Sequence, residues 1–154
     1  IQRWLAECDS THQRCKTGLS GELVGRETTL PTRLLFVGLS PDSKRKLTVT
    51  EGLRGTYTTL SHRWGSKALV QTTRANLSNH QQGVGLEKLP KTFEDAIKLT
   101  QMIGVPYIWI DSLCIIQDDP QDWANEARQM GAIYERSYLT IAASSGVDSK
   151  SGLY

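Results

Sequence analysis

The stretch Pro106-Tyr107-Ile108-Trp109-Ile110-Asp111 decides the fold class, because an almost wholly apolar run ends abruptly in an acid. Such a run, with no alternating polar residues, is typical of a strand covered on both faces in a parallel sheet. Residues 57–61 and 138–143 are two further strand candidates, and helical patterns separate the three strands. Strand, helix, strand, helix, strand predicts an α/β fold with a mostly parallel sheet flanked by helices.

The two helices are expected at residues 92–103 and 120–135, and their ends carry sequence signals. Thr92 is expected to cap the first helix, and Gly104 to end it. Asp119 favours the start of the second helix, because the proline that follows it is tolerated at the first helical position.

An extension precedes this alternating pattern. Residues 1–16 are expected to form a short amphipathic helix, and residues 32–37 and 46–50 are predicted to form two strands. The turn-forming Ser-Pro-Asp-Ser sequence between the two strands predicts a β-hairpin.

Length and charge set the domain count and exclude several classes. The 154 residues fit one domain, residues 1–154, in which residues 1–55 form the helix and hairpin extension and residues 56–154 the α/β core. A net charge of +2 argues against nucleic acid or an anionic membrane as partner. No apolar run reaches the ~18 residues of a membrane span. Three cysteines are an odd count without a disulfide framework, so reduced thiols and a cytoplasmic location are expected.

Polar residues that follow the apolar strands are the first candidates for a ligand site, since open α/β sheets bind ligands beyond the carboxyl ends of their strands. Residues 61–65, 111–114 and 144–146 are expected at this edge. Asp111 is the clearest candidate, although an acid is equally common there as a turn or cap residue.

Glu126 stands out in the second helix. At ~100° per residue, Trp123, Ala127, Met130 and Tyr134 form one apolar face, and Glu126 falls inside the apolar half of the helix. A carboxylate there must be paired, hydrogen-bonded or raised in pKa. One interpretation is a structural ion pair with an arginine, for which the candidates are Arg63, Arg128 and Arg136; the other is catalysis.

Cys8, His12 and Cys15 stand at i, i+4 and i+7, which places them on one helix face. They offer three zinc ligands, with His62 or Cys114 conceivable as a fourth, but neither a two-cysteine knuckle nor a second ligand pair is present. Packing is therefore the favoured interpretation of these residues, and no cofactor is expected.

Other chemical motifs are missing from the sequence. No stretch matches a glycine-rich phosphate-binding fingerprint or a nucleophile elbow. Cys114 lies between apolar residues, which predicts a buried and inert thiol.

Four blocks of this sequence together resemble one family, the fungal heterokaryon-incompatibility (HET) domain. These blocks are YTTLSHRWG at residues 57–65, LPKTFEDAI at 89–97, YIWIDSLCIIQDD at 107–119, and the segment from Asp122-Trp123 to Tyr134. The segment with Cys8, His12 and Cys15 also resembles one that often precedes this domain. His62 departs from the family, which usually has tyrosine at this position.

The HET family is similar to TIR domains, which are α/β modules of immune and cell-death signalling, and some of these hydrolyse NAD. This similarity implies a TIR-like (flavodoxin-like) fold and a cell-death effector with NAD glycohydrolase activity that requires self-association. Asp122-Trp123-Ala-Asn-Glu126 looks like the helix start where NAD-cleaving TIR domains carry their catalytic glutamate. Glu126 is therefore the expected catalytic residue, and the expected substrate-binding residues are Ser61, His62, Arg63, Trp64, Gly65, Asp111, Ser112 and Trp123.

One carboxylate suffices for this reaction, because nicotinamide leaves a cationic ring as a neutral base and needs no acid. Arg63 is expected to hold a phosphate, and Trp64 or Trp123 to stack on a base or on nicotinamide. The alternative is a non-enzymatic signalling module that triggers cell death through oligomerisation, in which Glu126 and Arg63 form a structural pair.

Overall fold

Strand β6 (Tyr107–Ile110) lies at the centre of an open five-stranded sheet. The computed structural model describes residues 1–12, 15, 17, 27–64, 70–83, 85–144 and 152–153. From one edge of the sheet to the other, the strands are β3 (Lys46–Val49), β2 (Arg33–Phe36), β6, β5 (Thr58–Ser61) and β7 (Leu139–Ala142).

The sheet is mixed, which confirms the α/β class and the hairpin but corrects the expectation of a mostly parallel sheet. Strand β5 pairs in parallel with both β6 and β7, whereas β2 is antiparallel to both β3 and β6. The two hairpin strands are antiparallel because the chain reverses in the connection of residues 37–45, which contains a turn at Ser40–Ser43, and β2 pairs with β6 on its other side. The extension therefore supplies two strands of the same sheet as the core.

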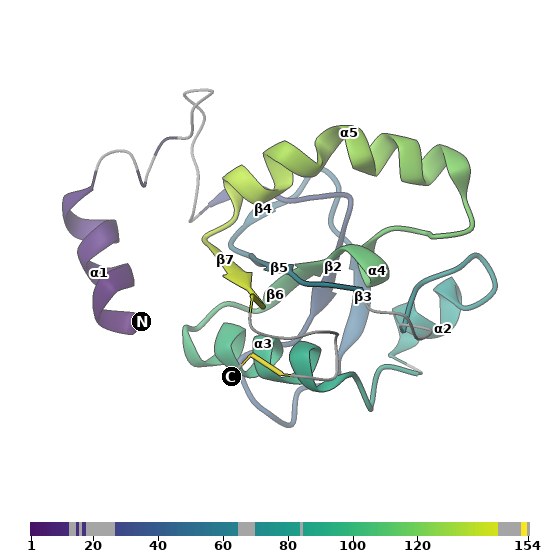
Figure 1. Cartoon of the computed structure of the whole chain (residues 1–154), viewed down its shortest axis with the longest axis horizontal. Helices are drawn as coiled ribbons and strands as arrows, with labels where there is room; N and C mark the ends of the chain where they lie inside the picture. The colour runs from purple at the N-terminus through teal and green to yellow at the C-terminus, as the bar shows by residue number, and fades with distance from the viewer. Residues whose placement is uncertain are drawn as a thin grey trace.

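Two helices cover opposite faces of the sheet, α3 (Lys91–Met102) on one side and α5 (Pro120–Arg136) on the other (Figure 1). Phe93 of α3 packs in a core with Ile108 and Ile110 of β6. Ile133 of α5 packs in a second core with Trp109, the residue between those two isoleucines. Since successive side chains of a strand point to opposite faces, this arrangement explains the unbroken apolar run of β6.

The helix ends differ in one place from the prediction. Pro90 stands at the N-cap of α3 without a side-chain cap bond, and Thr92 lies inside the helix, where its hydroxyl accepts a hydrogen bond from the Gly152 amide at 3.1 Å. Gly104 has φ +75° just after the helix end, as expected of a glycine stop. The Asp119 side chain accepts from the amides of Gln121 and Asp122, which confirms it as the N-cap of α5.

Helix α1 (Gln2–Thr11) lies at one side of the molecule and buries none of its ten residues (Figure 1). The Gln2 side chain donates to the Met102 carbonyl (2.7 Å), and the Tyr138 hydroxyl donates to Asp9 (2.9 Å). The expected packing of Cys8, His12 and Cys15 in a core is therefore wrong.

Four shorter elements complete the described chain. A separate two-stranded sheet is formed by β1 (Thr28–Thr29) and β4 (Arg54–Gly55), and the two short helices are α2 (Leu77–Gln82) and α4 (Asp111–Cys114). Within the described ranges, no helix has the length and apolar character needed to cross a membrane.

Candidate functional site

The carboxyl ends of β5 and β6 form a switch point of the sheet. The chain leaves β5 toward α3 and leaves β6 toward α5, and these two helices cover opposite faces. Ligands of open α/β sheets bind in the crevice at such a point. Strand β2 runs antiparallel to β6, with Leu35 opposite Ile108. Arg33, the first residue of β2, therefore lies at the same edge of the sheet as the end of β6.

His62, Trp64 and Asp111 meet at this edge, and we call them the edge group. The Trp64 indole Nε1 donates to Asp111 Oδ2 at 2.8 Å, and His62 Nδ1 lies 3.9 Å from Asp111 Oδ1. The imidazole is 1% exposed and stands edge-on to Phe93. Its two ring nitrogens have no hydrogen-bond partner among the described residues. Burial lowers the pKa of His62, and the Asp111 carboxylate acts in the opposite direction.

The other residues expected at this edge have varied environments. Ser61 and Arg63 are exposed, and the buried Ser112 hydroxyl has no partner within the part of the chain that the structure describes. Gly65 lies outside the described residues, as do two of the three residues expected from the 144–146 loop.

Glu126 is buried on the inner side of α5, as its place on the helix predicts. The residue is only 2% exposed, and its Oε2 atom has no hydrogen-bond partner among the residues described. Burial raises the pKa of Glu126, whereas the Thr32 hydroxyl and the Arg33 guanidinium act to lower it. The acids Asp122 and Glu51 also raise it, so burial and these two like charges together outweigh the two favourable neighbours.

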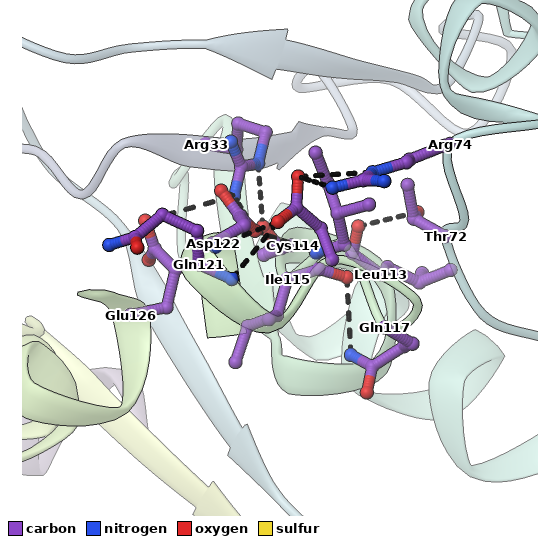
Figure 2. Close-up of polar contacts among 12 residues, drawn as sticks. Arg33, Thr72, Arg74, Leu113, Cys114, Ile115, Gln117, Gln121, Asp122 and Glu126 are labelled. Atoms are coloured by element: carbon purple, nitrogen blue, oxygen red, sulfur yellow. Dashed lines mark hydrogen bonds and ion pairs between the residues drawn. The ribbon is translucent and has the colours of Figure 1, made fainter. Parts of the chain in front are cut away.

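Arg33 is held by Asp122 rather than by Glu126 (Figure 2). Its Nη2 atom donates to both carboxylate oxygens of Asp122, at 2.7 and 2.6 Å, and its Nε donates to the Cys114 carbonyl at 2.8 Å. Glu126 Oε1 lies 3.7 Å from the same Nη2, beyond hydrogen-bond distance. The ion-pair partner of Glu126 is thus Arg33, which is none of the three arginines considered from the sequence, and Arg33 donates no direct hydrogen bond to the Glu126 carboxylate.

A cavity of about 420 Å³ opens beside Glu126. Glu51 also lines it as a second glutamate, and Arg128 contributes a cation. The complete lining is Thr32, Glu51, Asp122, Asn125, Glu126, Arg128 and Gln129. With three carboxylates among these residues, the cavity suits a ligand group that is cationic or that becomes cationic.

Trp123 does not line this cavity and is 53% exposed, so it does not form part of the buried face predicted for α5. Asp122 faces inward in its place, because its carboxylate binds Arg33 and accepts the Ile116 amide at 2.8 Å. The reasoning from the sequence missed Arg33. A charged residue beside the apolar Leu34-Leu35-Phe36 run of a strand was the signal that a buried counter-ion exists.

Cys114 is fully buried, and burial raises the pKa of its thiol to about 12. The prediction of a buried thiol is therefore confirmed, and its inertness stays a prediction. Neither Cys114 nor His62 belongs to the cluster formed by Cys8, His12 and Cys15.

Comparison with known proteins gives one family. The family described as heterokaryon incompatibility protein (HET) matches residues 57–154, which are more than half of the chain and run from just before β5 through β7. No curated protein and no solved structure matches the chain. The matched part contains the edge group and Glu126, whereas Arg33 precedes it. The chain belongs to the heterokaryon incompatibility protein (HET) family.

Proposed function

We propose that this HET domain serves heterokaryon incompatibility and cell death by binding NAD and hydrolysing its nicotinamide–ribose bond, with Glu126 as the catalytic carboxylate. One observation carries the proposal: a buried glutamate, whose Oε2 lacks a partner in the described chain, lies beside a cavity of about 420 Å³. Structural carboxylates in such positions are normally hydrogen-bonded. The resemblance to NAD-cleaving TIR domains, which goes beyond the family assignment, also supports NAD hydrolysis.

The charges of the cavity fit the nicotinamide end of NAD. The nicotinamide ring carries a positive charge, and burial raises the pKa of Glu126, so entry of a cation favours the ionised carboxylate that the reaction uses. Asp122 is already neutralised by Arg33, which leaves Glu126 as the buried acid available to the substrate.

In the reaction, the bond between C1′ of the ribose and the ring nitrogen breaks, and both bonding electrons stay with nicotinamide. The ribose becomes oxocarbenium-like, and the Glu126 carboxylate stabilises this charge and orients the ribose hydroxyls. Water then adds to C1′ and releases a proton, which gives ADP-ribose and neutral nicotinamide.

The edge group takes part in holding the rest of the dinucleotide. Asp111 begins α4 and Cys114 ends it, and the Cys114 carbonyl is bound to Arg33, which also neighbours Glu126. A four-residue helix is ~6 Å long, so the two sites lie within the span of one dinucleotide. We assign a phosphate to Arg128 or Arg63 and a stacked base to the exposed Trp64 ring.

The proposed activity requires self-association, as the TIR resemblance implies, and the proposed location is the cytoplasm, as the odd cysteine count favours. The test is to incubate concentrated wild-type protein with NAD and to measure nicotinamide release by chromatography. Glu126→Gln keeps the size of the side chain and removes its charge, and we expect at least a hundredfold loss of turnover, within the range typical of one essential electrostatic group. Glu87→Gln, an exposed glutamate outside this cavity, is the matched control and should release nicotinamide at the wild-type rate.

Undiminished turnover in folded Glu126→Gln would remove this residue from the mechanism, and no nicotinamide release by the wild type would remove the activity. A toxicity assay distinguishes NAD hydrolysis from the non-enzymatic alternative. Soluble Glu126→Gln that still kills cells would show that the domain acts by recruiting partners.

A further inference from the structure

Three metal-binding side chains gather where α1 ends. Cys8 lies in the last turns of the helix, His12 is its C-cap residue, and Cys15 follows in a tight turn. Backbone hydrogen bonds join the three, from the His12 amide to the Cys8 carbonyl and from the Cys15 amide to the His12 carbonyl, each at 3.2 Å. The backbone thus brings side chains at i, i+4 and i+7 to one place.

The spacing of the donor atoms suits a small tetrahedral ion. One ligand atom from each of the three residues lies within 4.8 Å of the other two, and Cys15 Sγ is 3.8 Å from His12 Nδ1. With Zn–S at about 2.3 Å and Zn–N at about 2.0–2.1 Å, tetrahedral geometry puts sulfur and nitrogen about 3.6 Å apart and two sulfurs about 3.8 Å apart. The Cys15–His12 pair is therefore within about 0.2 Å of the separation that zinc needs, and the others need only small side-chain movements.

Within the described parts of the chain, these three residues are not part of a buried core. None of the residues of α1 is buried, His12 and Cys15 are exposed, and the cysteines are free thiols. A divalent cation would bind by displacing these thiol protons.

We propose that Cys8, His12 and Cys15 bind one Zn²⁺ ion, with water at the fourth position. Two thiolates and one imidazole form a donor set that favours zinc over the oxygen-preferring cations. The other candidate ligands considered from the sequence, His62 and Cys114, are buried in the body of the domain and take no part. The ion would link Cys8 and His12 at the end of α1 to Cys15, and this site is independent of Glu126.

The test uses the whole 154-residue chain, purified without chelator in a phosphine reductant that keeps the thiols reduced. Zinc measured by atomic emission should approach one ion per chain after saturation and desalting. Substitution with Co²⁺ should give thiolate-to-cobalt charge-transfer absorption in the near ultraviolet, and added imidazole should change the cobalt spectrum by replacing the water. Zinc binding should also release protons into a weakly buffered solution.

Cys8→Ser, His12→Gln and Cys15→Ser should each lower zinc affinity at least tenfold and weaken or abolish the cobalt spectrum. Because α1 buries nothing, these variants should keep the wild-type circular dichroism spectrum. Glu7→Gln, an exposed neighbour on the same helix, should bind zinc like the wild type. The absence of retained zinc, a cobalt spectrum without thiolate bands, or full binding by Cys8→Ser would overturn the site; a spectrum insensitive to imidazole would overturn the open fourth position.

Discussion

Replacing Asp122 by asparagine tests whether its ion pair keeps Arg33 away from Glu126. Asparagine is almost isosteric, and its carbonyl oxygen can still accept the Ile116 amide, so the variant reports mainly the lost charge. At an effective dielectric constant of about 20, Arg33 attracts Asp122 at 2.6 Å by about 6 kcal/mol and Glu126 at 3.7 Å by about 4.5 kcal/mol. Without Asp122, Arg33 is expected to turn to Glu126.

The expected destabilisation follows from these contacts. Removing one partner of a buried ion pair costs about 3–5 kcal/mol. The Asp122 side chain is 16% exposed and Glu126 replaces part of the lost interaction, so we expect a decrease of about 2–3 kcal/mol in the free energy of unfolding. For a domain of this size, that lowers Tm by about 5–10 °C.

The assay is urea denaturation followed by circular dichroism for Asp122→Asn, Arg33→Met and the double variant. Their double-mutant cycle should give a coupling of about 2 kcal/mol between the two positions. Asp42→Asn makes the same chemical change at an exposed turn residue and should alter stability by less than about 0.5 kcal/mol. A coupling below about 0.5 kcal/mol would refute the organising role of this ion pair.

Three further results are expected. Burial raises the pKa of Glu126 in the folded state, so its contribution to stability is greatest below the unfolded pKa of about 4.3 and is lost as the pH rises through the folded pKa. Urea denaturation at increasing pH across this range should therefore show the stability of Glu126→Gln rising relative to that of the wild type. A stability difference that does not change with pH would contradict the raised pKa. The proposed NAD hydrolysis should in turn decline as the pH falls through that same raised pKa, when kcat/KM is measured with NAD well below KM so that the free enzyme is reported, and a pH-independent kcat/KM would contradict a role for the ionised carboxylate. Trp64→Ala should raise KM for NAD more than it lowers kcat, whereas Trp64→Phe should keep most of the affinity because it retains a ring for stacking; equal KM values for wild type and both variants would exclude stacking at this position.

The core of the fold could be predicted from local sequence because its signals are local. The apolar run of β6 identifies a strand buried on both faces, and Asp119 with the following proline marks the start of α5. The position of β2 beside β6 could not be predicted in this way. Strand pairing between residues more than seventy positions apart depends on tertiary packing, which no short pattern records.

The same distinction applies to the site. Helical spacing was enough to place Glu126 on the inner side of α5, but apolarity alone misplaced Trp123 there. Asp122 occupies the inward position because Arg33, remote in sequence, supplies a buried counter-ion. Likewise, the exposure of α1 depends on tertiary structure. Spacing alone therefore could not distinguish Cys8 in this helix and Cys15 after it from core residues.

The most direct measurement of the central claim is a crystal structure of the inactive Glu126→Gln variant with intact NAD. The proposal predicts the nicotinamide ribose in the cavity between Thr32 and Arg128, with a ribose hydroxyl within hydrogen-bond distance of the side chain at position 126. Nicotinamide ribose bound elsewhere on the domain, with this cavity holding only solvent, would contradict it.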